Sequence, residues 1–111
     1  MSKAEELLNI ANKTNIAEDF VKAGNNFIIE DKYGFAAEAF EKAGRVYIVN
    51  NNKYTAANIY VKAADNYIKD KQYNIAQNLL NLAINNYLEE EKFIYAAKQY
   101  VKKADNYVKD K

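Results

Sequence analysis

Large apolar residues and small residues alternate along this chain at the spacing of an α-helix. Two positions for large side chains recur about every twenty residues: Phe20, Phe40, Tyr60, Leu80 and Tyr100 at one, Phe27, Tyr47, Tyr67, Tyr87 and Tyr107 at the other. Two positions for small side chains recur with them: Ala23, Ala43, Ala63 and Ala83, then Ala36, Ala56, Ala76 and Ala96. A large residue beside a small one lets neighbouring helices interdigitate, so the pattern predicts closely packed helices.

The periodic segments predict about six helices, at residues 3–12, 16–30, 34–50, 54–70, 74–90 and 94–110. The chain has no Pro and only 3 Gly, so little would break them. Short polar connections force consecutive helices to run antiparallel. Gly24 and Gly44 lie beside the small positions, where the missing Cβ favours a close approach. We expect Thr14 or Asn15 to cap the second helix and Asn74 the fifth.

A longer repeat of about forty residues is laid over the shorter one. Val21, Val61 and Val101 widen the apolar stripe of alternate helices, where the intervening helices carry Glu41 and Asn81. This alternation predicts an all-α fold, a right-handed α-solenoid of antiparallel helical hairpins with two layers, forming a single domain over residues 1–111. Lys102 and Lys103 replace apolar or small residues in the last repeat, so we expect its outer face to be polar and the chain to end naturally near there.

Composition excludes several classes of function. With 16 Lys+Arg and 15 Asp+Glu the net charge is +1, which indicates no nucleic-acid partner. The chain has no Cys and no His, so it lacks disulfides, the commonest general base and the commonest metal ligand. We therefore expect no enzyme activity, no catalytic or metal-binding residues and no cofactor. No long apolar run follows the N-terminus, which indicates neither a signal peptide nor a membrane span and favours the cytoplasm.

Four segments resemble the N-terminal, tetratricopeptide-like (TPR-like) repeats of soluble NSF attachment proteins (SNAPs). They read FVKAGNNF at 20–27, AAEAFEKA at 36–43, YVKAADNY at 60–67 and AINNYLEEEKFIYAAK at 83–98. The resemblance implies a non-enzymatic adaptor of vesicle transport and membrane fusion, which lies along the four-helix SNARE bundle and recruits the hexameric ATPase NSF. In that family an N-terminal loop carries exposed Phe residues that touch the bilayer, and a C-terminal half stimulates NSF.

The chain departs from the family at both of these features. The first connection, residues 12–15, is polar, and nothing after Lys111 corresponds to the C-terminal half. We therefore expect SNARE binding without direct membrane insertion and without stimulation of NSF. The location expected is the cytoplasm, peripheral to membranes through a protein partner, or the host cytoplasm if the source is viral.

The resemblance also implies candidate binding residues. Lys69 and Lys98 match basic positions of the family's SNARE-facing surface. Lys22, Lys62 and Lys102 recur on alternate helices and would form a basic ridge. The simpler interpretation of each is a solvated surface lysine, because a single exposed charge contributes little.

The alternative interpretation is a TPR-like scaffold without a SNARE partner. Such a scaffold would form a homo-oligomer through its open ends, with Ile94, Tyr100 and Tyr107 of the last helix in the interface, or bind a peptide in its concave groove. Asn recurs at 26, 66, 86 and 106, where its amides would hydrogen-bond such a peptide. Base stacking by the Tyr residues is less favoured, because most of them occupy predicted core positions.

Overall fold

The computed structural model describes residues 1–110, which contain α-helices and no strand. Six helices follow one another, as the pattern predicted: α1 (Lys3–Thr14), α2 (Ala17–Ile29), α3 (Tyr33–Val49), α4 (Lys53–Lys69), α5 (Tyr73–Glu89) and α6 (Phe93–Asp110). They form an all-α helical-repeat fold. The single domain and the right-handed superhelix stay predictions.

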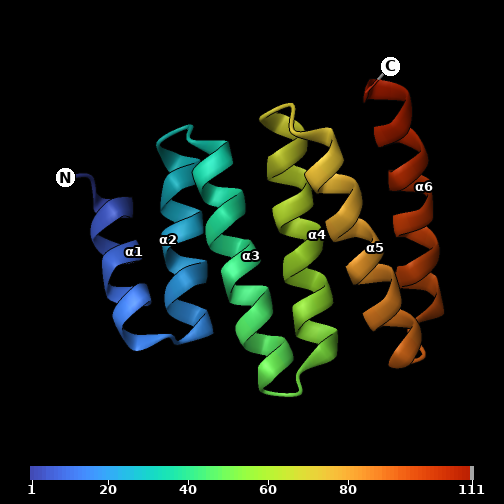
Figure 1. Cartoon of the computed structure of the whole chain (residues 1–111), viewed down its shortest axis with the longest axis horizontal. Coiled ribbons are helices and arrows are strands. Elements are labelled where there is room, and N and C mark those ends of the chain that lie inside the picture. The colour runs from blue at the N-terminus through green and yellow to red at the C-terminus, as the bar shows by residue number, and fades with distance from the viewer. Residues whose placement is uncertain (111) are drawn as a thin grey trace.

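The helices stand in a row, each antiparallel to the one before it, with α1 and α6 at opposite ends (Figure 1). Each helix packs mainly on its neighbours in sequence, and the extents of 39 × 34 × 17 Å describe a flat slab. Side chains also join every second helix directly. Lys62 Nζ lies 3.2 Å from Asn25 Oδ1, and Lys102 Nζ lies 2.9 Å from Asp65 Oδ1. The even-numbered helices α2, α4 and α6 therefore share one layer.

The core consists of most of the large and small positions that the sequence pattern predicted, but Tyr47 is half-buried and Tyr100 and Tyr107 are exposed. The fully buried alanines at the small positions are Ala23, Ala36, Ala43, Ala56, Ala63, Ala76 and Ala83. The large side chains between them are at most 5% exposed: Phe20, Phe27, Phe40, Tyr60, Tyr67, Leu80 and Tyr87. Burying an aromatic or aliphatic side chain of this size contributes about 1.5–3 kcal/mol. Because the same large and small positions are buried in successive helices, the period of about twenty residues describes the packing of the array.

Aromatic rings of the following helices pack directly against Gly24 and Gly44, where the sequence indicated a close approach. A Cβ built on Gly24 would lie 2.6 Å from a ring carbon of Phe40, and one on Gly44 would lie 2.6 Å from a ring carbon of Tyr60. Real Cβ atoms do not approach carbon so closely. The equivalent position of α4 is Ala64, and the residue sixteen further on is Leu80 instead of an aromatic residue. The size of each small residue thus matches the large residue of the next helix.

The four connections after α2, α3, α4 and α5 share one geometry. Each has a residue in the left-handed conformation, with φ of 59°, 63°, 61° and 56° at Asp31, Asn51, Lys71 and Glu91. The next amide donates to a carbonyl five residues back, as from Lys32 to Phe27 and from Lys92 to Tyr87. This is the Schellman motif, which satisfies the last carbonyls of a helix. Glycine is the usual residue at the left-handed position, and none of these connections has it there.

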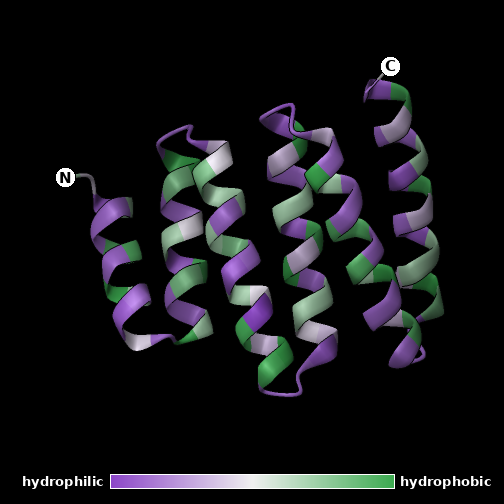
Figure 2. Ribbon diagram, in the orientation of Figure 1, coloured by the Kyte–Doolittle hydropathy of each residue, from purple (hydrophilic) through white to green (hydrophobic). Residues whose placement is uncertain are grey.

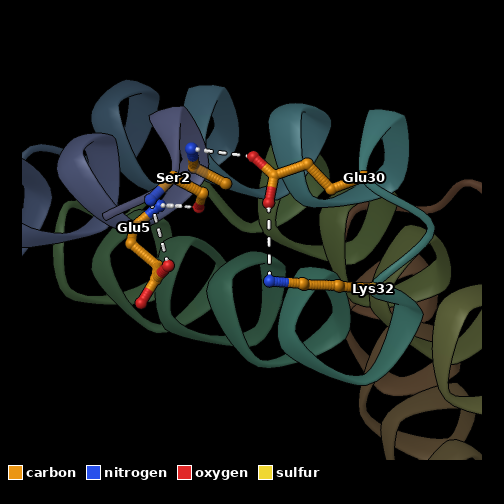
Figure 3. A network of polar contacts seen from close by, with 5 residues as sticks. Ser2, Glu5, Glu30 and Lys32 are labelled. Atoms are coloured by element: carbon orange, nitrogen blue, oxygen red, sulfur yellow. Dashed lines mark hydrogen bonds and ion pairs between the residues drawn. The ribbon is translucent and has the colours of Figure 1, made fainter.

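The N-terminus of α1 is fixed by a small polar network (Figure 3). The Glu5 amide donates to the Ser2 hydroxyl and the Ser2 amide donates to the Glu5 carboxylate, each at 3.1 Å, which is a capping box. These hydrogen bonds lower the pKa of Glu5. The carboxylate of Glu30 accepts from the Ala4 amide at 3.2 Å and lies 3.7 Å from Lys32 Nζ. The network therefore attaches α1 to the connection between α2 and α3.

The caps expected for the second and fifth helices are wrong. Ile16 and Gln72 occupy those N-cap positions, and neither side chain makes a capping hydrogen bond. Thr14 accepts from the Ile16 amide at 3.3 Å and donates to Asp19 at 2.7 Å, so it braces the turn instead. Asn74 lies inside the first turn of α5. The N-cap of α5 therefore lies two residues earlier than expected, directly after the Schellman turn that ends α4, whereas the N-cap of α2 lies one or two residues later than expected.

Two buried tyrosines use their hydroxyl groups to join α4 to its neighbours. Tyr67 donates to Glu41 Oε1 at 2.7 Å, and Tyr87 donates to Asn58 Oδ1. Burial raises the pKa of both phenols, that of Tyr87 to about 12, and the hydrogen bond to Glu41 adds to the rise at Tyr67. Both hydroxyls therefore stay protonated and donating at neutral pH.

The Gly24–Phe40 contact predicts a size-matched pair of substitutions. Gly24→Ala adds a methyl group against a fully buried ring, and overpacking costs about 1–3 kcal/mol, which outweighs the gain of about 1 kcal/mol in helix propensity. Phe40→Leu reproduces the Ala64–Leu80 combination, so the double variant should be more stable than the sum of the two single effects indicates. Urea unfolding of the four proteins measures this coupling.

Gly34→Ala is the matched control for this series, because its Cβ would meet the exposed end of the Asp70 side chain, which can move aside, instead of a buried ring. We expect it to be neutral or stabilising, by up to about 1 kcal/mol. Strict additivity of Gly24→Ala and Phe40→Leu would contradict the packing argument.

The left-handed turns predict a stabilising glycine. Glu91→Gly removes the Cβ strain at φ 56°, which is about 1–2 kcal/mol, against about 0.4–1 kcal/mol of added freedom in the unfolded chain. The midpoint of urea unfolding should therefore rise. Glu90→Gly removes the same charge at φ −94°, where no such strain exists, and should lower the midpoint. Equal shifts for the two variants would show that charge, not backbone geometry, decides the result.

Candidate partner-binding surface

The row formed by Lys22, Lys62 and Lys102 lies at one position of the even-numbered helices, but two of its members connect helices. Besides its hydrogen bond to Asn25, Lys62 Nζ lies 5.0 Å from the centre of the Phe40 ring. The ammonium group of Lys102 forms an ion pair with Asp65. Each of these lysines therefore reaches back to an earlier helix, and only Lys22 keeps the role of a plain exposed lysine that the sequence indicated for the row.

Lys69 and Lys102 come together beside a hollow between α4 and α6. The hollow has a volume of about 420 Å³, and its polar lining is Asp65, Lys69, Lys102, Asp105, Asn106 and Lys109. We call it the basic hollow, because three lysines face two carboxylates there. Asp65 is already paired with Lys102, which leaves Lys69 and Lys109 as the lysines that a partner's carboxylates can approach.

The sequence analysis missed Lys109. It lies forty residues after Lys69, and the long repeat therefore contained the signal that would have identified it. Lys69 Nζ also lies 5.1 Å from the centre of the Tyr33 ring. Such a contact at an exposed site contributes about 0.5–1 kcal/mol, so it orients the lysine without removing it from solvent.

Lys98 does not line the basic hollow. Its ammonium group lies 5.9 Å from the centre of the Tyr95 ring, within the same helix. Lys98, Lys102 and Lys109 nevertheless share one stripe of α6, because they are separated by four and seven residues. The predicted lysines Lys69, Lys98 and Lys102 thus belong to one side of the slab, and Lys22 and Lys62 continue it along α2 and α4.

The outer face of α6 contradicts the expectation of a polar end. This face consists of Ile94, Ala97, Tyr100, Val101, Ala104 and Tyr107, all of them exposed. Tyr100 is 54% exposed, Tyr107 is 57% exposed and Ile94 is 74% exposed. Lys102 points elsewhere, since its ammonium group pairs with Asp65 of α4, whereas the ammonium group of Lys103 lies 5.8 Å from the centre of the Tyr100 ring. Sequence reasoning therefore placed Lys102 on the wrong side of the helix.

The recurring asparagines do not form a row open to a peptide. Asn66 and Asn106 are buried, and the Asn106 amide donates to the Tyr73 carbonyl at 3.0 Å and to Gln77 at 2.7 Å. Asn26, Asn66 and Asn86 each donate to a carbonyl four residues earlier in their own helix. Asn106 instead fastens α6 to α5 and thereby fixes the direction of its outer face.

The chemistry of the described residues is that of a charged and apolar surface. Within residues 1–110 no group of three or more acidic side chains is placed to hold a metal ion. None of the helices in that range is both long and apolar enough to span a bilayer. The surface can therefore offer ion pairs from the basic hollow and apolar contacts from the end of the array.

Comparison with known proteins identifies the family of the chain. Neither the search of curated proteins nor the search of solved structures returned a match. The family model of the soluble NSF attachment protein, SNAP, matches residues 7–111, which include every helix from α2 to α6 and most of α1. The chain belongs to the SNAP family.

Proposed function

We propose that this chain is a SNAP-like adaptor segment that binds a SNARE helical bundle in vesicle transport and membrane fusion. The family match over residues 7–111 carries the proposal. The binding surface proposed is the side of the slab that holds the basic hollow, with Lys69, Lys98 and Lys109 facing the partner and Lys22 at its far end. Lys62 and Lys102 support this surface by tying the even-numbered helices together.

The physical basis of the proposal is charge on a rigid, elongated frame. A flat slab 39 Å long presents its lysines at fixed separations, as recognition of another rod-like helical assembly requires. Attraction between these lysines and acidic side chains of a helical bundle acts over about 10 Å at moderate salt. It accelerates encounter more than it strengthens the final complex.

An adaptor role implies a protein that has no catalytic activity and reaches membranes through its partner. In this proposal the chain stays in the cytoplasm and meets the bilayer only where SNARE proteins are anchored. The polar connection at residues 12–15 offers no large apolar side chain of its own for insertion. Binding of a peptide in a concave groove is the weaker candidate, because the asparagines that favoured it bond within the fold.

A charge-reversal experiment tests the proposed surface. Lys69→Glu combined with Lys109→Glu should slow association with an assembled SNARE complex on the order of tenfold at low salt, because it reverses both available charges of the basic hollow. The difference should shrink as salt is raised from about 0.05 to 0.5 M. Surface plasmon resonance on an immobilised SNARE complex gives both rates.

Lys13→Glu combined with Lys42→Glu is the matched control. It makes the same change in net charge at two exposed lysines of α1 and α3, away from the basic hollow. The control should associate nearly as fast as the unmodified chain. An equal loss in both variants would assign the attraction to net charge alone, and absence of binding by the unmodified chain at low salt would overturn the proposal.

A second measurement concerns NSF. Because the resemblance implies that stimulation of the ATPase belongs to a region absent from these 111 residues, the chain alone should leave NSF turnover on SNARE complexes unchanged. At saturating concentration it should instead lower the turnover produced by a full-length SNAP, by occupying the same bundle. ATP hydrolysis by NSF is measured first with the chain alone and then with the chain in competition with a full-length SNAP. Stimulation by the chain alone would contradict this prediction.

A further inference from the structure

A second hollow lies beside the α1–α2 connection, at a step in the array. α2 has 13 residues and α3 has 17, and the two are joined where α2 ends. At about 1.5 Å per residue, α3 is therefore about 6 Å longer than α2. Figure 1 shows the lower end of α3 extending past the α1–α2 connection. α3, α4 and α5 all have 17 residues, so they are matched in length.

The hollow at this step has a volume of about 430 Å³ and is partly apolar. We call it the α1–α3 hollow. Its apolar lining is Phe20, Val46 and Val49, of which Phe20 is buried and Val49 is 83% exposed. Figure 2 shows hydrophobic residues over the last turn of α3, next to the step. A hollow of this volume is large enough for a small ligand or the end of a peptide.

The rest of the lining carries positive charge and side-chain amides. Its members are Lys42, Arg45, Asn12, Asn15 and Asn50. Among residues 1–110 no carboxylate belongs to this lining, whereas the basic hollow contains two. Forty residues further on, α5 has Leu82 and Asn85 in place of the two cations. The positive charge therefore belongs to the step and is not part of the repeat.

The charge of the α1–α3 hollow favours a ligand with a single negative charge. The Arg45 guanidinium is paired with the Glu41 carboxylate, which also accepts from the Tyr67 hydroxyl. Glu41 thus balances one of the two cations, while N–H groups of Arg45 other than Nη2 stay available to a ligand. A phosphate monoester carries a charge of about −1.5 to −2 at neutral pH. A carboxylate, with one negative charge, matches the hollow better.

The amide side chains favour a peptide over a simple carboxylic acid. Asn12, Asn15 and Asn50 are exposed, and each amide has both hydrogen-bond donors and an acceptor. A peptide backbone offers partners for both beside its terminal carboxylate, whereas a hydrocarbon chain offers none. The apolar lining in turn favours an apolar side chain on the last residue, because burying it removes apolar surface from water.

We propose that the α1–α3 hollow binds the free C-terminus of a polypeptide whose last side chain is apolar. Lys42 and Arg45 bind the terminal carboxylate, and Val46 and Val49 contact the last side chain. Capture of a terminal carboxylate is a recurring mode of peptide recognition. Because both cations are exposed, the expected dissociation constant is modest, about 0.1–1 mM. The inference does not depend on SNARE binding, since the basic hollow lies between α4 and α6.

NMR titration of the isotope-labelled chain tests the proposal with a defined probe. The probe is a short acetylated peptide of glycine and serine that ends in leucine with a free carboxylate. It should shift resonances of the α1–α2 connection and of the last turn of α3. The same peptide with a C-terminal amide, or with glycine as its last residue, should bind about tenfold more weakly or less. Equal binding of the leucine acid and the leucine amide would overturn the proposal, as would no binding of the acid at several millimolar.

Two further probes separate the chemical classes of ligand. Inorganic phosphate that bound more tightly than the leucine peptide would overturn the charge argument. Octanoate that bound more tightly than the peptide would overturn the assignment to a polypeptide. We expect both to bind more weakly.

Lys42→Gln combined with Arg45→Gln removes both cations and should weaken binding of the leucine peptide about tenfold or more. Lys3→Gln combined with Lys71→Gln is the matched control, since it removes the same charge at the opposite edge of the array. The control should bind like the unmodified chain, and an equal loss in both variants would overturn the proposal. All four side chains are exposed, so circular dichroism should show an unchanged helix content.

Val49→Ser tests the apolar contact. It should weaken binding of the leucine peptide several-fold and leave the glycine-ended peptide unaffected, and equal effects on both would overturn the proposal. The SNARE experiment stays separate. The Lys69→Glu/Lys109→Glu variant leaves the α1–α3 hollow intact and should bind the leucine peptide normally. The Lys13→Glu/Lys42→Glu variant should lose the peptide and keep its association with the SNARE complex.

Discussion

The fit of one aromatic ring over a residue without a side chain sets the spacing of this protein. Gly24 against Phe40 and Gly44 against Tyr60 bring consecutive helices together at a distance that no Cβ would permit. The contact recurs with the repeat, and where α4 has Ala64 the opposing residue becomes Leu80. Packing at this density leaves little freedom for one helix to slide on another, so the position of each helix fixes that of the next.

This form of construction produces an array that is open at its ends. A closed bundle would bury every apolar face against its own helices, whereas a row of antiparallel pairs covers each helix only when another follows it. α1 bears a polar capping network at one end, and α6 exposes the same apolar face that α4 hides at the other. Within residues 1–110, the outer face of α6 is therefore an exposed apolar end of the array.

The charged side chains divide into those that hold the array and those that face solvent. Lys62 and Lys102 connect even-numbered helices, while Lys69 and Lys109 border a hollow with room for a partner's acidic groups. Lys98 stands at the boundary between this hollow and the outer face of α6.

The sequence by itself determined the helices, their antiparallel order and the core, because the large and small positions recur at a fixed period and helical periodicity is a local property. It also identified Gly24 and Gly44 and, through the segments shared with SNAPs, the family. Only the tertiary structure decided which side of a helix each lysine occupies: Lys102 was expected to face outward and instead pairs with Asp65 of α4. The ion pair of Lys102 with Asp65 joins α6 to α4, which are not consecutive helices. The residue pattern within a single helix does not show which helices come within reach of its side chains. The same holds for the exposure of Tyr100, which is 54% exposed although its segment, YVKKADNY at 100–107, differs only at Lys103 from the YVKAADNY segment that contains the buried Tyr60.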